Sequence, residues 1–223
     1  MTSVWISLSV GAAATLLSLP PGVAAAWFLE RGRPRARGPV QTLVMLPLVL
    51  PPVVTGWFLL KLFSPRGPLG RALEAAGTPV AFHWLGAVVA AAVVGFPLLV
   101  MTSSLAFKAV DPRLETASRA LGRSPAQTFL RVTLPLAWPG ILAGAALSFA
   151  RGLGEFGATI VLAGRVPGET ETIPLAITAE LEAPGGEARI GGLVAASVAL
   201  CLACVLAALA LDARWRRRLE LER

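Results

Sequence analysis

Residues 84–107 read WLGAVVAAAVVGFPLLVMTSSLAF and contain no Asp, Glu, Lys or Arg. A helix of about 20 mostly apolar residues is long enough to cross the hydrocarbon core of a bilayer. The full chain of 223 residues is 55% hydrophobic and 15% charged, with a mean hydropathy of +0.70. This composition is too apolar for an ordinary soluble domain and favours a polytopic membrane protein.

Working outward from this stretch, we find five segments that are long and apolar enough to cross a membrane as helices. They are residues 4–29, 40–63, 84–107, 137–163 and 190–211. Little of the chain remains for a separate globular domain. We therefore expect residues 1–223 to form one all-α transmembrane domain with about five membrane-spanning helices.

The basic residues predict the orientation, because cytoplasmic segments collect Lys and Arg. Most follow the first span, follow the third span or lie in the C-terminal tail: Arg31, Arg33, Arg35, Arg37; Lys108, Arg113, Arg119, Arg123, Arg131; Arg214, Arg216, Arg217, Arg218, Arg223. We expect the N-terminus outside and the C-terminus inside a bacterial or archaeal cytoplasmic membrane. This topology and anionic headgroups, rather than nucleic acid, explain the net charge of +7.

The second predicted span contains Pro47, Pro51 and Pro52. Each proline removes a backbone donor that hydrocarbon cannot replace, so this helix must be kinked and packed against protein. Two interpretations stay open. The span is either a bent packing helix or a broken helix of the kind that lines the path of a transporter.

The segment between the third and fourth spans carries signals for two short helices. Asp111, followed by proline, is a helix start, and Gly122 ends that helix. Ser124 and Pro125 then begin a second short helix that extends to about residue 131. The pattern predicts a compact pair of cytoplasmic helices beneath the membrane.

The same segment carries a spaced motif: Glu115, Thr116 and Ala117, then Gly122, then Val132, Leu134 and Pro135. It resembles the motif of binding-protein-dependent ABC importer permeases, which usually reads Glu-Ala-Ala, with Gly and then Ile-x-Leu-Pro. Thr116 and Val132 are modest departures from that pattern. The resemblance implies that these are coupling helices, seated in a groove of a separate ATPase subunit.

The residue types of the motif suit such a contact. Gly122 and Ala117 would allow backbones to approach closely. Glu115 offers charged hydrogen bonds to a partner or to a neighbouring loop. Pro135 is expected to break the chain before the fourth span.

A second resemblance covers residues 152–177, with GLGEFGATI at residues 152–160, and residues 47–56, PLVLPPVVTG. Both are similar to the molybdate importer permease subfamily. Sulfate and thiosulfate permeases share a Gly-Glu-[Phe/Tyr]-Gly element but usually differ after it. The resemblance implies import of an oxyanion, with molybdate as the leading substrate and tungstate or sulfate as alternatives. It also implies a homodimer that works with two ATPase subunits and an external oxyanion-binding protein.

Arg151 and Glu155 lie four residues apart in the fourth predicted span, where ionisable groups are costly unless they are paired or face water. In one hypothesis, Arg151 supplies a positive field for a dianion while Glu155 orients it or holds a gate. In the other, the two form a structural pair. The candidate pathway residues are Arg151, Glu155, Gly152, Gly154, Gly157, Pro51 and Pro52, the glycines being suited to a tight crossing between two copies.

No motif for covalent chemistry, a metal or a cofactor is found. Lys61 and Lys108 lie outside any phosphate-binding Gly-x-x-x-x-Gly-Lys-[Ser/Thr], so ATP with magnesium is expected on the partner ATPase. Cys201 and Cys204 lie inside the fifth apolar segment without further ligands, and we interpret them as packing residues. The alternative class is an ion-coupled secondary transporter, which usually needs internal repeats and more intramembrane carboxylates.

Overall fold

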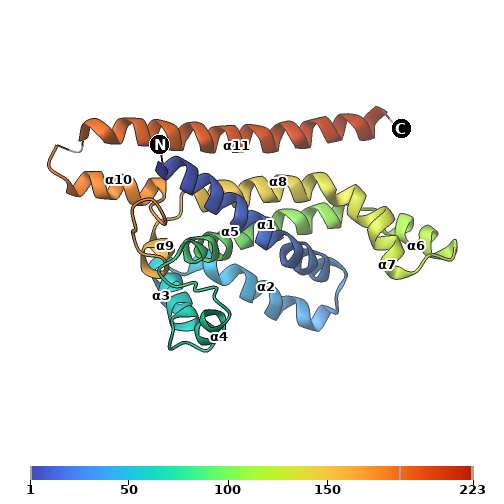
Figure 1. Cartoon of the computed structure of the whole chain (residues 1–223). Coiled ribbons are helices and arrows are strands. Elements are labelled where there is room, and N and C mark those ends of the chain that lie inside the picture. Colours follow the sequence, from blue (N-terminus) through green and yellow to red (C-terminus); the bar gives the residue numbers. More distant parts are fainter. Residues whose placement is uncertain (1, 186, 222–223) are drawn as a thin grey trace.

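The computed structural model describes residues 2–185 and 187–221, and all regular structure within these residues is helical (Figure 1). The elements in chain order are α1 (Thr2–Arg31), α2 (Pro34–Val49), α3 (Pro52–Phe63), α4 (Gly70–Ala75), α5 (Trp84–Ala109), α6 (Pro112–Ala120), α7 (Pro125–Thr128), the π-helix η1 (Phe129–Thr133), α8 (Leu134–Leu153), α9 (Gly157–Leu162), α10 (Ile173–Glu182) and α11 (Glu187–Leu221).

Five crossings of a membrane fit the described residues. Four single helical segments are long and apolar enough: Thr2–Arg31, Trp84–Ala109, Pro125–Leu153 and Arg189–Ala208. The bent pair α2 and α3 makes a fifth when the two helices are counted together as one span. The predicted all-α membrane fold with about five spans is therefore confirmed.

The centre of the bundle is α5, which packs against both α1 and α8. Its small residues Ala87, Ala90 and Val94 are fully buried. At the crossing with α8, a Cβ added to Gly95 would lie 2.5 Å from Ser148 Oγ, so the two helices approach closely only because Gly95 has no side chain. Small side chains on α5 thus let its neighbours pack at short distance.

The second span is broken rather than merely kinked. Helices α2 and α3 meet at an angle of 113°. Leu50 and Pro51 between them are extended, with ψ values of 141° and 133°. The residue before a proline is disfavoured in the α conformation, and two successive prolines supply no N–H group, so the helix cannot continue through residues 50–52.

The fourth span differs from the prediction at both ends. Its helix stops at Leu153, and α9 follows as a separate short helix after residues 154–156. Glu155 therefore lies in the turn between two helices and not inside a span. Glycines at positions 152 and 154 favour this stop, because glycine loses more conformational freedom in a helix than other residues.

The prediction that Pro135 breaks the chain before this span is wrong. The elements α7, η1 and α8 follow one another without a gap, so the second short helix also does not end near residue 131. Within the π-turn, the Leu134 N–H bonds to the Phe129 carbonyl. Pro135, the second residue of α8, has no N–H to donate, and the π-turn directly before it lets the continuous helix accommodate the proline.

The segment of residues 164–189, between the fourth and fifth predicted spans, contains α10. Thr172 precedes this helix and Pro174 lies in its first turn. Proline is favoured in the first turn of a helix, so the sequence held a start signal there that hydropathy did not reveal.

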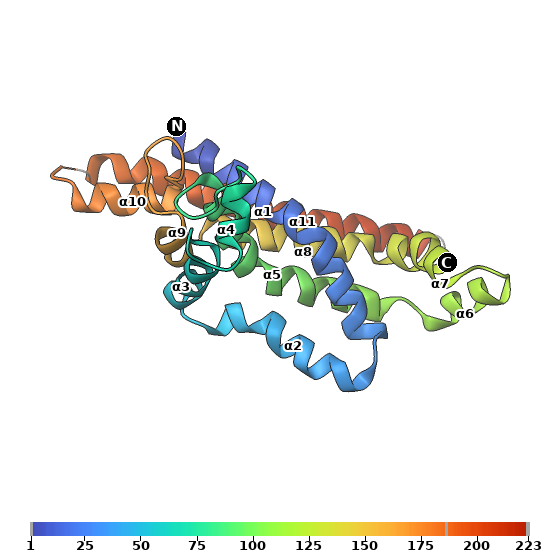
Figure 2. The same cartoon turned by 60° about the horizontal axis from the view of Figure 1, so that its bottom comes forward.

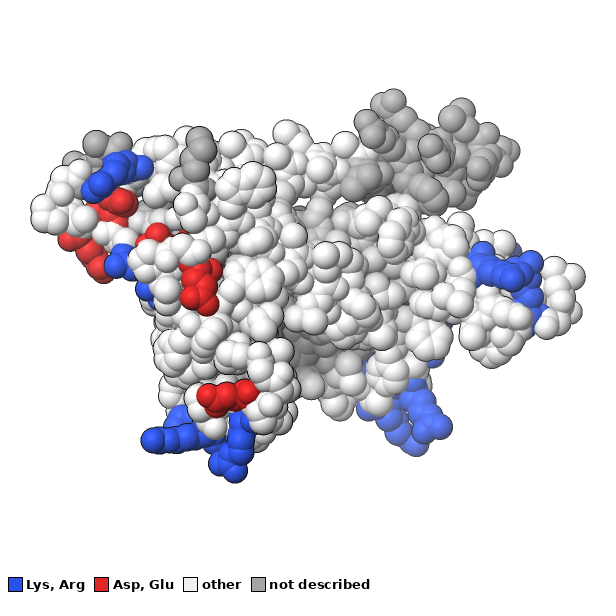
Figure 3. Space-filling view, in the orientation of Figure 1, with Lys and Arg blue, Asp and Glu red and all other residues white. Residues whose placement is uncertain are grey.

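The bundle has two chemically different ends. Helices α6 and α7 project from the end where α11 finishes, whereas the start of α1 lies with α10 at the opposite end (Figures 1 and 2). On the face drawn in Figure 3, Lys and Arg lie at both ends, acidic residues are seen only around the second end, and the surface between the ends is almost free of charge. An uncharged band between charged ends is the pattern of a membrane-spanning bundle.

Candidate functional site

The first candidate site is the helical hairpin of α6 and α7, called here the coupling knob and comprising residues 112–128. The Asp111 side chain accepts a hydrogen bond from the Arg113 N–H at 2.9 Å and so caps the start of α6. At the other end Gly122 has φ of 82°. The Gly122 and Arg123 N–H groups bond to the carbonyls of Arg119 and Ser118, at 2.9 and 3.3 Å, which closes the helix in a Schellman motif.

Gly122 thus allows the turn after α6 because it adopts a positive φ, which residues with a Cβ rarely adopt. A Cβ at this position would meet nothing within 4 Å, so the expected close backbone approach is not made to any described part of this chain. The predicted bounds of this first short helix are confirmed.

The start of α7 is fixed by a capping box. The Gln127 N–H donates to Ser124 Oγ at 3.2 Å, and the Ser124 N–H donates to Gln127 Oε1 at 3.0 Å. The two helices of the knob are joined through buried hydroxyls, because Ser118 Oγ and Thr128 Oγ1 lie 3.1 Å apart. Local sequence signals therefore determine the shape of the knob.

Glu115 is turned inward. Its side chain is buried, and its carboxylate lies 3.2 Å from Arg31 Nε at the end of α1. Thr133 Oγ1 of η1 donates to the same carboxylate at 2.9 Å. Of the two partners considered from the sequence, another subunit or a neighbouring segment, the structure shows the second.

The remaining motif residues lie around the outer surface of the knob and at its junction with α8. Thr116, Ala117, Gly122 and Pro135 are exposed, while Val132 and Leu134 are half-buried. Leu121, next to the exposed residues of α6, is 82% exposed.

The second candidate site is formed where two breaks in the helices meet. A Cβ added to Gly157, the first residue of α9, would lie 2.8 Å from Pro52 Cβ at the start of α3. A Cβ on Gly56 would lie 2.8 Å from the Ala158 Cα. Backbones approach here at distances that only glycine permits. The break in the second span is thus packed directly on the break after the fourth.

Arg151 and Glu155 lie at this junction and bond to each other, with Arg151 Nη1 and Glu155 Oε2 2.8 Å apart. Glu155 is buried, and its other oxygen accepts the Ala158 N–H at 2.8 Å, at the positive end of α9. The Arg151 side chain is 31% exposed. The carboxylate is therefore satisfied within the chain, whereas the Arg151 side chain keeps part of its surface exposed.

The other candidate pathway residues occupy different surroundings. A Cβ added to Gly152 would lie 3.4 Å from the Ala91 Cβ of α5, which is an ordinary van der Waals contact. A Cβ added to Gly154 would meet only the Arg151 carbonyl, at 3.9 Å. Pro51 is exposed at the turn between α2 and α3. The structure thus brings Arg151, Glu155, Gly157 and Pro52 together and leaves Gly154 open.

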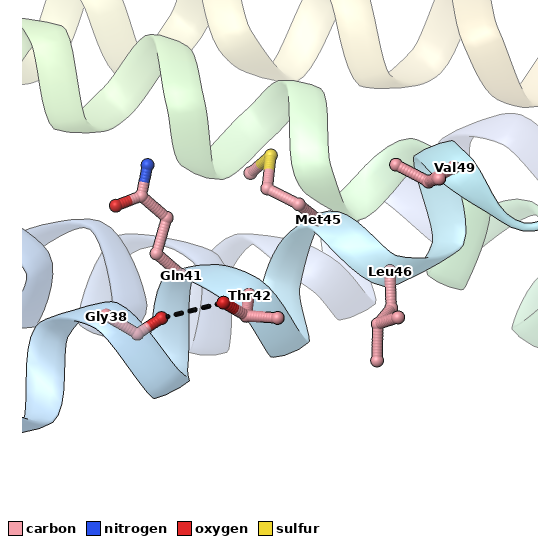
Figure 4. A pocket seen from close by; sticks show the side chains of 6 residues that line it. All are labelled: Gly38, Gln41, Thr42, Met45, Leu46 and Val49. Carbon is pink, nitrogen blue, oxygen red and sulfur yellow. Dashed lines mark hydrogen bonds between the residues drawn. The ribbon is translucent and has the colours of Figure 1, made fainter.

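The structure contains one groove that the sequence analysis did not predict. A groove of about 520 Å³ runs along one face of α2, where Gln41 and Met45 point to the same side (Figure 4). It is lined by Gly38, Gln41, Thr42, Met45, Leu46 and Val49. None of these residues is charged, so the groove does not have the chemistry expected for binding a dianion.

Arg31 and Thr133 are the residues around the knob that sequence reasoning missed. Arg31 was counted only among the basic residues that predict orientation. Its partner Glu115 is 84 positions away, and no local periodicity reports such a contact. Among the described residues, no group of three or more His, Cys, Asp or Glu could hold a metal ion.

Comparison with known proteins agrees with this architecture. Residues 18–220 match the family model described as "Binding-protein-dependent transport system inner membrane component". The chain is 44% identical over 222 residues to the molybdenum transport system permease protein ModB of Escherichia coli (strain K12), covering 99% of this chain and 95% of the relative. It is 40% identical over 220 residues to ModB of Haemophilus influenzae, covering 98% and 96%.

Among solved structures, the chain resembles the MetNI methionine ABC transporter in inward-facing conformations, with a TM-score of 0.69, 20% identity and coverage of 96% and 94%. At this identity the likeness concerns the fold alone. The match to the family model extends over both candidate sites, and its relatives are permease subunits of transport systems. The chain therefore belongs to the family of binding-protein-dependent transport system inner membrane components.

Proposed function

We propose that this chain is the membrane-spanning subunit of an ATP-driven importer that carries molybdate across the cytoplasmic membrane of a bacterium or archaeon. The observation that carries the proposal is the near full-length similarity to permeases named for molybdenum transport. The geometry supports the proposal in two ways. The coupling knob projects from one end of the bundle, and the break between α2 and α3 packs on the break between α8 and α9.

The knob is the proposed contact with a dimer of separate ATPase subunits. Thr116, Ala117, Gly122 and Leu121 offer a small, partly apolar outer surface that fits a groove on another protein. ATP with magnesium is bound on the ATPase, and this chain contributes motion rather than chemistry or a cofactor. The knob then lies in the cytoplasm, together with the end of α11, and the N-terminus lies outside.

The junction of the two helix breaks is the proposed part of the translocation pathway. Half-exposed Arg151 supplies a positive charge for a dianion, while Glu155 holds Arg151 and the start of α9 in place. Pro51 and Pro52, with Gly152, Gly154 and Gly157, shape the broken backbone around them. Two copies of residues 1–223, each acting as a single transmembrane domain, would enclose the path, and an external oxyanion-binding protein would deliver the substrate.

Substrate and energy source are tested together by uptake into cells that lack their own importer. The chain is expressed with candidate ATPase and binding-protein partners, and tungstate or sulfate is added as a competitor. Molybdate uptake that tungstate blocks and sulfate does not block is the expected result. Inhibition by sulfate would assign the chain to sulfate or thiosulfate transport. Uptake that survives ATP depletion but is abolished by an uncoupler would assign it to secondary transporters.

A further inference from the structure

We propose that Arg31 is a positioning residue that fastens the coupling knob to α1 and α5, so that movement of α6 is passed to both spans. The functional half of this inference rests on the proposed function. The structural half concerns only contacts within the chain.

Arg31 is the last residue of α1, and its guanidinium bonds in two directions. Nε lies 3.2 and 3.4 Å from the two carboxylate oxygens of Glu115 on α6. Nη2 donates to the backbone carbonyls of Phe107 and Val110, at 3.4 and 3.3 Å. One planar side chain therefore joins the end of α1, the end of α5 and the knob.

The carbonyl contacts have a clear physical reason. The last carbonyls of a helix have no partner within it and carry the negative end of the helix dipole. Phe107 and Val110 are buried at the end of α5, so water has little access to their carbonyls. The Phe107 carbonyl also accepts the Val110 N–H, at 3.3 Å. A guanidinium offers several donors in a fixed fork, whereas a lysine ammonium is a single compact charge.

Glu115 extends the link to the fourth span. Thr133 Oγ1 donates to it from η1, and both residues are buried. Next to Arg31, Glu30 accepts a hydrogen bond from Ser104 Oγ at 2.5 Å, which holds α1 against α5. Two acidic side chains, one basic side chain and two hydroxyl side chains thus connect three spans with the knob close to the point where α6 begins.

Apart from this link, α6 packs mainly on α7 and η1, the elements that follow it in the chain. Its connection to α5 is the short turn at Val110 and Asp111. A push on the knob would therefore reach α8 through η1. It would reach α1 and α5 by two routes, through Arg31 and through Phe129 of η1, whose ring packs on Trp27 and Phe107. Loss of the guanidinium should loosen α6 and separate ATP hydrolysis from transport.

The test uses Arg31→Gln in the full complex in lipid nanodiscs and in vesicles, with Arg35→Gln as the matched control. Arg35 is an exposed arginine in the same basic segment. In Arg31→Gln, amide hydrogen exchange over residues 112–121 should rise about tenfold, as expected when a charged hydrogen-bond pair no longer opposes local opening. The ATP hydrolysed per molybdate imported should rise about fivefold or more, the lower range of an allosteric coupling. Arg35→Gln should change neither quantity.

Arg31→Lys keeps the positive charge but removes the branched set of guanidinium donors. This variant provides the test if the Arg31→Gln complex does not assemble. Because an ammonium cannot reach the carboxylate and both carbonyls together, exchange and the ATP ratio should both exceed the native values. Native values in Arg31→Lys, or an unchanged ATP ratio in Arg31→Gln, would overturn the proposal. A fall in ATPase and uptake by the same factor would mean a purely structural role and would also overturn it. Absence of ATP-dependent uptake in the native complex would refute the proposed function, and the exchange data would still decide whether Arg31 holds the knob.

Discussion

At the scale of single residues, Arg151 and Glu155 have separate tasks although they form one ion pair. Glu155 is buried and satisfied by Arg151 and by the first turn of α9. Arg151 is partly open to its surroundings. An arginine that keeps exposed surface beside a broken helix is suited to attract an anion, while its buried partner keeps the arginine in place.

Replacing Arg151 by Gln tests the pathway role. A charge-assisted contact with the dianion, worth roughly 1.5–3 kcal/mol, would be lost, so uptake should fall about tenfold or more while the complex still assembles. The control is Arg165→Gln, which removes an arginine that lies 4.0 Å from Glu171 and is not one of the junction residues. Uptake is measured with labelled molybdate. Normal uptake by an assembled Arg151→Gln complex would restrict Arg151 to a structural role.

Gly157 carries the second prediction at this scale. Its missing side chain allows α9 to lie on Pro52, so Gly157→Ala should destabilise the chain by about 1–3 kcal/mol through overpacking. Gly154→Ala is the matched control, because the added Cβ would meet no atom closer than 3.9 Å. Thermal unfolding in detergent compares the two variants. Equal melting temperatures would contradict the close contact between the two helix breaks.

At the scale of elements, the coupling knob is built from local signals. The Asp111 cap, the positive φ of Gly122 and the capping box of Ser124 can all be recognised in the sequence. Their partners lie within a few residues, so short-range patterns suffice. The knob was accordingly predicted with its first helix correct, and only the end of the second helix was misplaced.

Ser124→Ala tests this account of the knob. Loss of an N-cap costs about 1 kcal/mol, so amide exchange over residues 125–128 should rise. Ser124→Asp, which keeps a side-chain acceptor at the same position, should retain native exchange. The measurement is hydrogen exchange followed by mass spectrometry. Identical exchange in the alanine and aspartate variants would show that the capping box does not hold α7.

Other elements could not be predicted from local patterns. Hydropathy treats residues 137–163 as one apolar run and is insensitive to the turn at residues 154–156. The continuous helix through Pro135 depends on the π-turn of η1, which propensity rules do not anticipate. The contact of Glu115 with Arg31 depends on packing between distant segments.

At the scale of the whole molecule, burial is unevenly distributed. Within their most apolar windows, 61% of the α5 span is buried, but none of the Arg189–Ala208 span in α11 is. Lipid or a second copy of the chain must cover this apolar surface in a membrane. The proposed homodimer would cover part of it and place two Arg151 side chains around one path.

The homodimer predicts the composition of the purified complex. Native mass spectrometry of the complex from nanodiscs should give two copies of this chain with two ATPase subunits. A wild-type chain co-expressed with a differently tagged copy provides the control, since both tags should be recovered together. A complex with a single copy of this chain would contradict the proposed path between two protomers.

The central claim is that ATP hydrolysis on a partner drives an oxyanion through this chain. The most direct measurement is molybdate accumulation in sealed vesicles that contain the purified complex, with binding protein outside and ATP inside. Accumulation should require internal ATP and should stop when the ATPase subunit carries a substitution that prevents hydrolysis. Equal accumulation with the inactive ATPase, or accumulation driven by an ion gradient without ATP, would contradict the account.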